Sequence, residues 1–255
     1  MINFPSAKIN IGLDIIKKRE DSYHNISSIF YPILSLTDIL EITESRYFSF
    51  NTSGLRIPAG ENLCEKAFRL LKEDFSFPNI NIHLHKQIPI GAGFGGGSSD
   101  AAYTLKGINK LFNLNINFNQ LKEYALQLGA DCPFFIDNTP KYVEGIGDKM
   151  TSINLDLSNF EIKLINSGIH IPTKEAYSNI IPSIPEYSVL ESIKNPINDW
   201  KFTIKNDFEM SIFERFPKLK SIKEHLYNEG AVYASMTGSG SSIYGIFAKS
   251  NSNLE

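Results

Sequence analysis

A glycine-rich segment near the middle of the chain has the composition of a phosphate-binding loop. Five glycines and two closing serines make it up: Gly91, Gly93, Gly95, Gly96, Gly97, Ser98 and Ser99. Because glycine has no Cβ, its backbone takes positive φ and comes close to a bound group. The N–H groups at the start of a following helix carry partial positive charge, which suits a phosphate. The segment lacks the closing Gly-Lys-Ser/Thr of a Walker A loop, so we expect a phosphate site of another kind.

The residues on either side indicate that this segment is not a flexible linker. An alternating strand from Ile80 to Ile88 precedes it, and Pro89 ends that strand because proline cannot donate a ladder hydrogen bond. Ser98 stands where a helix N-cap belongs, and a helix containing Ala101 follows. A linker would not lie between a patterned strand and a capped helix. The segment is therefore predicted to bind an anion.

Lys8 and Asp131 have the chemistry that phosphoryl transfer to an alcohol requires. That reaction needs a positioned hydroxyl, an acceptor for its proton and cations near the developing charge. Asp131 follows Gly129-Ala130 at a helix end and precedes Pro133, so a short turn holds its carboxylate. The alternatives are a turn or cap role for Asp131 and a solvated position at a strand end for Lys8.

Alternating and helical patterns predict the elements that must position these residues. In the first half, helices are expected around Leu63 to Leu71, after the glycine loop, and from near Asn119 to Gly129. Asn62 is suited to cap the first of these helices. The strands expected before them are Ala7 to Ile16, Ile26 to Leu34, Asp38 to Thr43 and, more weakly, Tyr47 to Phe50.

A second half of the chain is expected to begin near Ser152. It contains short helices between prolines, and the stretch Ser188 to Thr203 carries no signal with a chemical interpretation. The other expected elements are a strand at Glu161 to Ile165, a helix at Pro217 to Glu229 and, after the turn Thr237-Gly238-Ser239-Gly240, a strand at Ile243 to Phe247.

Composition limits the class of protein. The 255 residues are 42% hydrophobic and 21% charged, which is typical of a globular protein with a proper core. The net charge of −3 gives no reason to expect nucleic acid or an anionic membrane as a partner. Cys64 and Cys132 are too few for a disulfide framework. With no leader-like N-terminus and no apolar run of membrane length, a cytoplasmic protein is expected.

The glycine segment and several other motifs resemble those of one enzyme superfamily. The run from Pro89 to Ala102, with its Gly-Gly-Gly-Ser-Ser-Asp-Ala-Ala, is similar to the second motif of the GHMP kinases. Its triple glycine resembles one branch, the 4-diphosphocytidyl-2-C-methyl-D-erythritol kinases. Four further stretches agree with that branch in the same order along the chain: Ser6 to Asn10, Asp21 to His24, Leu128 to Pro133 and Thr237 to Gly240. Weaker echoes are Glu144 to Gly147, Ile171 to Thr173 and Asn206 to Glu209.

The resemblance implies a fold and a reaction. The fold is a two-domain α+β GHMP kinase, with domains at 1–151 and 152–255, the second trimmed at its end relative to many members of the family, and with the active site in the cleft between them. The reaction transfers the γ-phosphate of ATP to the 2-hydroxyl of 4-diphosphocytidyl-2-C-methyl-D-erythritol, in the non-mevalonate route to isoprenoid precursors. Asp131 is then the general base, and Lys8 lies beside it and orients the alcohol.

The same resemblance assigns the binding residues. Tyr23 stacks on the cytosine, His24 reads its polar edge, and Tyr177 forms the opposite face unless it is an ordinary helix-face tyrosine. Asn10, which shares a strand face with Lys8, contacts the substrate. The remaining assignments are Pro172, Thr237 and Gly238 for the substrate, and Asn62, Pro89 and the glycines and serines of the Gly91 to Ser99 loop for ATP.

The expected partners follow from these assignments. Mg²⁺ should arrive with ATP, since no cluster of His or Cys indicates a resident metal site. A small-molecule substrate, no nucleic acid, no membrane and a monomer or weak homodimer are expected. The alternatives are another GHMP kinase, acting on homoserine or a mevalonate derivative, and a catalytically silent relative that only binds a nucleotide.

Overall fold

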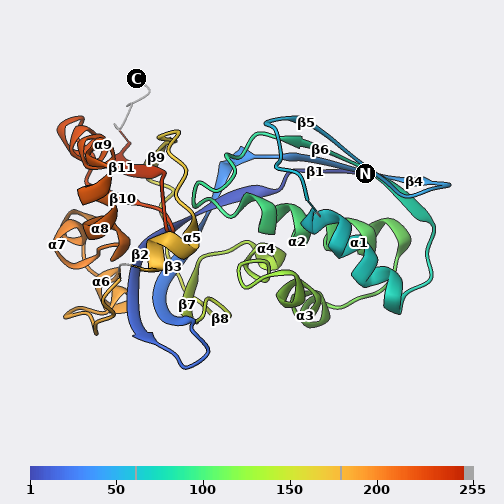
Figure 1. Ribbon diagram of the computed structural model, residues 1–255, viewed down its shortest axis with the longest axis horizontal. Coiled ribbons are helices and arrows are strands. Elements are labelled where there is room, and N and C mark those ends of the chain that lie inside the picture. The colour runs from blue at the N-terminus through green and yellow to red at the C-terminus, as the bar shows by residue number, and fades with distance from the viewer. Residues whose placement is uncertain (61, 179, 250–255) are drawn as a thin grey trace, which may run out of the picture. The chain divides into compact units, whose positions relative to one another are not determined.

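The structure is a computed structural model that describes residues 1–60, 62–178 and 180–249 (Figure 1). Its helices and strands form two compact units. Unit 1 comprises Met1–Ile9, Pro32–Ile90 and Phe94–Thr139, and unit 2 comprises Asn10–Tyr31, Gly91–Gly93 and Pro140–Glu255. This division differs from a single boundary after residue 151, because β2 (Ser6–Lys18) and β3 (His24–Thr37) each contribute residues to both units. The boundary of the two family domains stays a prediction.

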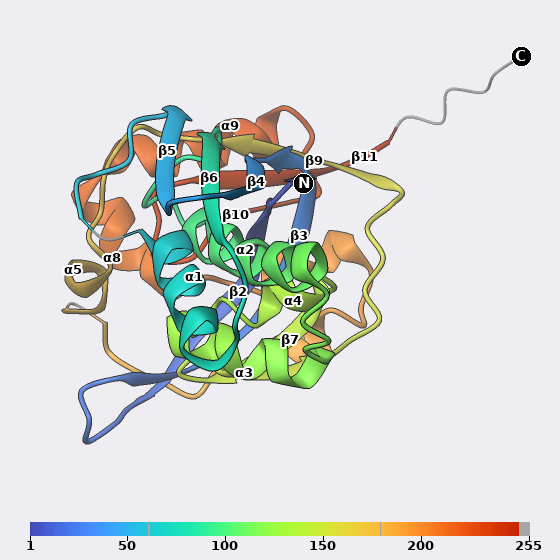
Figure 2. The same cartoon turned by 90° about the vertical axis from the view of Figure 1, so that its right-hand side faces the viewer.

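Unit 1 contains a four-stranded sheet in the order β1-β4-β6-β5. β5 and β6 are parallel and are connected through helix α1, whereas the other neighbours are antiparallel (Figure 2). Buried and half-buried side chains alternate along the whole of β6, as the sequence predicts. The strands are β1 (Ile2–Asn3), β4 (Ile39–Ser45), β5 (Ser49–Gly54) and β6 (Asn79–Lys86).

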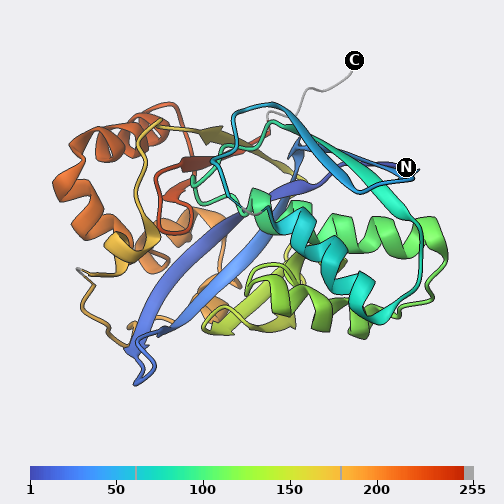
Figure 3. The same cartoon turned by 45° about the vertical axis from the view of Figure 1, so that its right-hand side comes forward.

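Helices cover this sheet from one side. Helix α2 packs against β4, and α1 and α3 pack against α2 and each other (Figure 3). Asn62 caps α1 as predicted: its side chain accepts from Cys64 N at 2.8 Å, and Glu65 accepts from Asn62 N. The helices are α1 (Leu63–Asp74), α2 (Gly96–Phe112), α3 (Phe118–Leu128) and α4 (Phe134–Asp137).

Unit 2 contains a three-stranded antiparallel sheet in the order β10-β11-β9, on which α9 packs. A second sheet, in the order β2-β3-β7-β8, joins the long strands β2 and β3 to a hairpin. The buried apolar residues of this unit come from both sheets and from α5, α8 and α9, and include Ile15, Phe208 and Ile243. The strands are β7 (Lys141–Gly145), β8 (Lys149–Ser152), β9 (Phe160–Ile165), β10 (Tyr233–Met236) and β11 (Ile243–Ala248).

The helices of unit 2 are mostly short. The uninterpreted stretch Ser188 to Thr203 folds into three single turns, and its Trp200 is buried. In the described part of the chain, no helix combines the length and apolar character that crossing a membrane requires. The helices are α5 (Thr173–Ser178), α6 (Val189–Ser192), the 3₁₀ turn Ile197–Asp199, α7 (Trp200–Thr203), α8 (Phe208–Arg215) and α9 (Pro217–Asn228).

Two predicted element boundaries are wrong. The strand before the glycine loop ends at Lys86 rather than at Ile88, because Gln87 N and Ile88 N donate to the Asp38 carboxylate instead of to a neighbouring strand. Ser98 is not the N-cap of the helix after the glycine loop, because α2 begins at Gly96 and Gly95 is its cap. Gly95 has φ 70° and ψ 17°, a left-handed conformation that turns the backbone sharply into the helix and that glycine adopts without strain. The helix therefore starts inside the triple glycine, and Ser98 lies in its first turn.

Candidate active site

The glycine loop has the backbone geometry of an anion site. Gly91, Gly93 and Gly95 all have positive φ, at 65°, 86° and 70°. Ser99 N donates to Gly95 O at 2.9 Å as the first helical bond of α2, so the preceding N–H groups, from Gly96 to Ser98, lie at the helix N-terminus. Pro89 is half-buried between β6 and this loop. The loop is therefore formed as predicted, but its serines differ, since Ser99 is buried and Ser98 is half-buried.

Packing explains why glycine is needed at one of two neighbouring positions of the loop, but not at the other. A Cβ on Gly96 would lie 2.8 Å from Lys86 Nζ and 2.9 Å from an Ile88 methyl group, so packing within unit 1 requires glycine there. A Cβ on Gly97 would meet nothing within 4 Å, and its φ is not positive. Glycine inside a helix costs stability relative to alanine. The protein's own packing therefore gives no reason for glycine at position 97.

Lys8 and Asp131 are brought together in unit 1. Lys8 Nζ lies 3.7 Å from Asp131 Oδ2, and the lysine side chain is buried while the carboxylate is one-third exposed. Burial lowers the pKa of Lys8, and the charge of Asp131 partly offsets that effect. The backbone also fixes Lys8, because its N–H donates to Phe94 O at 2.9 Å. A Cβ on Gly95 would lie 3.2 Å from Lys8 Cε, so the lysine stem runs directly beneath the glycine loop.

A tight turn presents Asp131. Helix α3 ends at the predicted Gly129, and Cys132 N donates back to Gly129 O at 3.1 Å. Phe134 N donates to Asp131 O at 3.3 Å, so the backbone of this aspartate is bonded within the turn. Cys132 is fully buried, as predicted for a packed thiol. The turn therefore leaves the Asp131 side chain as its exposed functional group.

Asn10 and Thr237 form one network in unit 2. Asn10 N donates to Thr237 Oγ1 at 3.0 Å, and Asn10 Nδ2 donates to Ser28 Oγ at 2.9 Å. The Thr237 hydroxyl also donates to Gly93 O at 3.2 Å. Gly238 has φ 59°, and a Cβ there would lie 3.2 Å from Gly93 Cα. The turn Thr237 to Gly240 thus contacts the first part of the glycine loop within this unit.

Asn206 and Glu209, which lie in a weaker echo of the family motifs, hold the turn Thr237 to Gly240 in place. Asn206 Nδ2 donates to the carbonyls on both sides of Thr237, Met236 O at 2.8 Å and Gly238 O at 2.9 Å. Glu209 Oε1 accepts from Met236 N at 2.8 Å. Both side chains are buried. They are structural supports of the predicted substrate residue Thr237, and no predicted role had been given to them.

Tyr23, His24 and Tyr177 line one cavity of unit 2, with a volume of about 750 Å³, within the usual range for small-molecule sites. The rings of His24 and Tyr177 are stacked, with centroids 4.9 Å apart and an interplanar angle of 27°. Tyr23 is 62% exposed at the turn between β2 and β3. Burial, and then the charge of Lys18, lower the pKa of His24. Pro172 accepts from Glu175 N and Ala176 N, which starts the helix that carries Tyr177.

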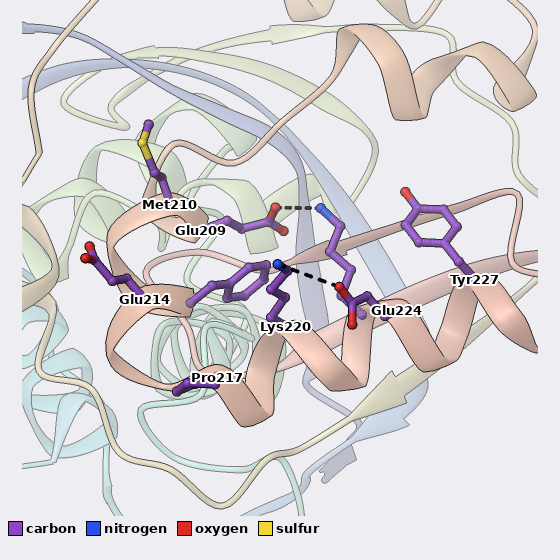
Figure 4. A pocket seen from close by; sticks show the side chains of 9 residues that line it. Glu209, Met210, Glu214, Pro217, Lys220, Glu224 and Tyr227 are labelled. Atoms are coloured by element: carbon purple, nitrogen blue, oxygen red, sulfur yellow. Dashed lines mark hydrogen bonds and ion pairs between the residues drawn. The ribbon is translucent and has the colours of Figure 1, made fainter.

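A second cavity, of about 710 Å³, lies between α8 and α9 (Figure 4). Four of the residues that line it form two ion pairs, Glu209 with Lys223, and Lys220 with Glu224 at 3.9 Å. Met210, Phe213 and other side chains of the two helices complete its wall. None of the predicted site residues lines this cavity.

A buried charge cluster in unit 1 was not among the predictions from the sequence. Lys86 makes ion pairs with Asp38 and Asp100, and all three side chains are buried. One signal was available: Ile80, Ile82 and Leu84 point inward by the strand's period of two, and Lys86 is next on that face. A lysine in a buried register position indicates a partner of opposite charge.

Comparison with known proteins identifies the family. Models of the GHMP kinases N terminal domain and the GHMP kinases C terminal domain match residues 62–138 and 190–254. The 4-diphosphocytidyl-2-C-methyl-D-erythritol kinase of Bacteroides thetaiotaomicron is 50% identical over 253 residues, which cover 97% of this chain and 92% of that protein. The enzyme of the same name from Azobacteroides pseudotrichonymphae is 50% identical over 252 residues, with coverage of 98% and 94%.

Solved structures agree with this result. A crystal structure of 4-(cytidine 5'-diphospho)-2C-methyl-D-erythritol kinase has a TM-score of 0.84 at 31% identity, and covers 96% of this chain and 90% of its own. A homoserine kinase from Cytophaga hutchinsonii has a TM-score of 0.69 at 17% identity, with coverage of 96% and 86%, a likeness that shows the fold alone. The predicted α+β kinase fold is confirmed. The chain belongs to the GHMP kinases, in the family of the 4-diphosphocytidyl-2-C-methyl-D-erythritol kinases.

Proposed function

We propose that this chain transfers the γ-phosphate of ATP to the 2-hydroxyl of 4-diphosphocytidyl-2-C-methyl-D-erythritol, which yields the 2-phosphate and ADP. The observation that carries the proposal is the pair of Lys8 and Asp131, which lies beneath Gly95 of the glycine loop. A carboxylate, a buried cation and a phosphate-binding loop are the parts that phosphoryl transfer to an alcohol needs. Relatives half identical to this chain carry the name of that kinase.

Each residue then has one task in the reaction. Asp131 accepts the proton of the substrate hydroxyl as its oxygen attacks the γ-phosphorus. Lys8 holds the Asp131 carboxylate and places a positive charge near the transferring group. The N–H groups at the start of α2 bind the phosphates of ATP, and Asn62 contributes near the adenine in addition to its capping role.

The cavity around Tyr23, His24 and Tyr177 is proposed to hold the cytosine. Flat aromatic rings stack on a base with little regard for its identity, so the hydrogen bonds of His24 should select cytosine. Asn10, Thr237, Gly238 and Pro172 are proposed to contact the rest of the substrate. The hydrogen bonds among Asn10, Thr237 and Gly93 support a common role for these segments.

Mg²⁺ is proposed to arrive bound to ATP. Among the described residues there is no group of three or more His, Cys, Asp or Glu side chains able to hold a metal. Phosphate oxygens and water would hold most of the coordination positions of the Mg²⁺ ion, and its charge would neutralise that of the transferred group. The cytoplasmic location and the monomeric or weakly dimeric state stay predictions.

The alternatives are less well supported. A homoserine or mevalonate kinase has no use for an aromatic cavity that suits a base, and the likeness to such enzymes shows only the fold. A silent nucleotide-binding relative has no need of a lysine and an aspartate held as an ion pair beneath the loop.

One assay separates these possibilities. ADP release is measured with MgATP and, in parallel, the cytidyl substrate, homoserine or mevalonate, and the product is identified by ³¹P NMR. The proposal expects turnover with the cytidyl substrate only, with a new phosphate monoester on its 2-oxygen. Turnover with another alcohol, or ATP binding without any turnover, would contradict it.

A further inference from the structure

The buried cluster of Lys86, Asp38 and Asp100 lies at the base of the glycine loop, within unit 1. Lys86 Nζ contacts Asp38 Oδ2 and, at 2.7 Å, Asp100 Oδ2. The three side chains are at most 3% exposed. Lys86 is the last residue of β6, Asp38 separates β3 from β4, and Asp100 is in the first turns of α2.

The cluster attaches to both ends of the loop. On the entering side, Asp38 Oδ1 accepts from Gln87 N at 2.6 Å and from Ile88 N at 2.9 Å, which are the last residues before Pro89. On the leaving side, Asp100 is the fifth residue of the helix whose first N–H groups face the proposed phosphates. The ammonium also lies close to the loop itself, since a Cβ on Gly96 would lie 2.8 Å from Lys86 Nζ.

We propose that Lys86 and Asp100 are positioning residues for ATP, in which one buried ammonium ties the strand that enters the glycine loop to the helix that leaves it. The inference rests on the proposed role of this loop in ATP binding. Stability alone is a poor explanation of the cluster, because buried ion pairs add little beyond well-packed apolar residues of the same volume. Fixing the positions of the N–H donors is the function that requires charges at this place.

The unequal charges of the cluster predict a coupling between phosphate binding and proton uptake, which a purely structural role would not produce. One lysine faces two carboxylates, and Asp100 Oδ1 is buried without a hydrogen-bond partner among the described residues. Burial, reinforced by Asp38 and opposed by Lys86, raises the pKa of Asp100 to about 8. Among the described residues, the thiol of Cys64 from α1 also interacts with the charge of Asp100, and burial raises the pKa of that thiol.

Bound phosphates would add negative charge at the end of the helix that carries Asp100. They should therefore favour the protonated carboxyl, and binding near pH 8.5 should take up part of a proton. Lys86 stays protonated in this range, because its two carboxylate partners raise its pKa despite burial. The coupling is thus a property of Asp100, and an amide at this position abolishes it.

The experiment uses the Mg²⁺ complex of a non-hydrolysable ATP analogue as the probe and compares Lys86→Met and Asp100→Asn with the wild-type protein. Calorimetry gives the Kd and, in two buffers of different ionisation enthalpy at pH 8.5, the protons taken up. The matched control is Lys141→Met, which removes another buried lysine, one that donates to Ser152 in unit 2. Circular dichroism checks that each variant is folded.

The expected result is a Kd raised roughly 10- to 100-fold in both variants, with kcat at saturating ATP and the KM for the cytidyl substrate within about threefold of wild type. Asp100→Asn should also lose the proton uptake, and Lys141→Met should keep the wild-type Kd. An unchanged Kd in Asp100→Asn overturns the inference even if Lys86→Met fails to fold. If the wild-type protein does not bind the analogue at all, the proposed function itself fails, which is a distinct result.

Discussion

The ammonium of Lys8 lies 3.7 Å from a carboxylate oxygen of Asp131, and only the aspartate reaches the surface. The lysine side chain is 4% exposed and the aspartate side chain 34%. A buried cation next to a partly exposed carboxylate restricts the orientation of the carboxylate, while part of its side chain stays open to solvent. This asymmetry supports the proposed roles of Asp131 as proton acceptor and Lys8 as positioning residue.

Asp131→Asn should abolish most of the activity and spare nucleotide binding. The amide has the shape of the carboxylate but cannot accept the substrate proton, so kcat should fall roughly 10²- to 10⁴-fold, while the KM for ATP stays near wild type. The control is Asp137→Asn, which removes another lysine-paired carboxylate of the same unit, bonded to Lys122. Steady-state kinetics with the cytidyl substrate check the prediction. A kcat close to wild type in Asp131→Asn would remove Asp131 from the mechanism.

Gly97→Ala should weaken ATP binding without weakening the fold. A methyl group at this position meets no protein atom within 4 Å, and alanine stabilises a helix relative to glycine by about 0.5–1 kcal/mol. If phosphates approach the backbone here, the same methyl group raises the KM for ATP. Gly107→Ala, in the same helix, is the opposite case, because its methyl group would lie 2.7 Å from Ile42 Cδ1.

The two alanine variants therefore separate ligand contact from packing. Gly107→Ala should lower the free energy of unfolding by roughly 1–3 kcal/mol and leave the KM for ATP unchanged. Urea denaturation and initial rates are measured on both. Gly97→Ala with a wild-type KM for ATP would mean that phosphates do not approach this residue closely.

Sequence patterns predict many of the helices, strands and caps of this protein, because residues close together in the chain determine these features. The alternation along β6 and the Asn62 cap of α1 depend on residues within a few positions of each other, and both are confirmed. The end of α3 at Gly129 is confirmed for the same reason. The family motifs extend this reach, since they identify the fold from short ordered stretches.

The features that sequence analysis missed are set by contacts between distant residues. Lys86 lies 48 positions from Asp38, and Asn206 lies 30 positions from Met236, so no window of sequence shows either partner. The N-terminus of α2 was misplaced because serine is the commoner cap, whereas the loop here turns through a left-handed glycine. The charged and amide groups that support the site were thus harder to predict than the site's own motifs.

Replacing Tyr177 by leucine should weaken binding of the cytidyl substrate specifically. The Tyr177 ring stacks on His24 and makes an edge contact with Phe208 at 4.8 Å, so it is a fixed wall of the cavity. Loss of one stacking partner costs about 1–3 kcal/mol, so the KM for this substrate should rise roughly 5- to 150-fold with an unchanged KM for ATP.

Two further variants control this measurement. Tyr177→Phe keeps the ring and should bind the cytidyl substrate nearly as well as the wild-type protein. Tyr187→Leu removes an exposed tyrosine that does not line the cavity and should have no effect on either KM. Equal losses in Tyr177→Phe and Tyr177→Leu would assign the role of Tyr177 to its hydroxyl and contradict stacking.

Asp14→Asn should stabilise the protein above neutral pH. Asp14 is 4% exposed, and its Oδ2 has no hydrogen-bond partner among the described residues. Burial and then the charge of Asp207, opposed by Lys205, raise its pKa from 3.8 to about 7. Between these values the folded protein holds a proton that the unfolded chain has released. The free energy of unfolding therefore falls as the pH rises from about 4 to about 7, and the loss is complete above that range.

Asparagine at position 14 cannot ionise, so the variant avoids this loss. Relative to the wild-type protein, its free energy of unfolding at pH 8 should be higher by roughly 1–3 kcal/mol, and the difference should shrink towards pH 4. Urea denaturation of both proteins at pH 4.5 and pH 8 measures it, with Asp156→Asn as an exposed control whose carboxylate two Ser158 hydrogen bonds favour in its ionised form. If Asp14→Asn were destabilised equally at both pH values, the folded protein would hold Asp14 as an ionised acceptor, and the pH dependence would need another source.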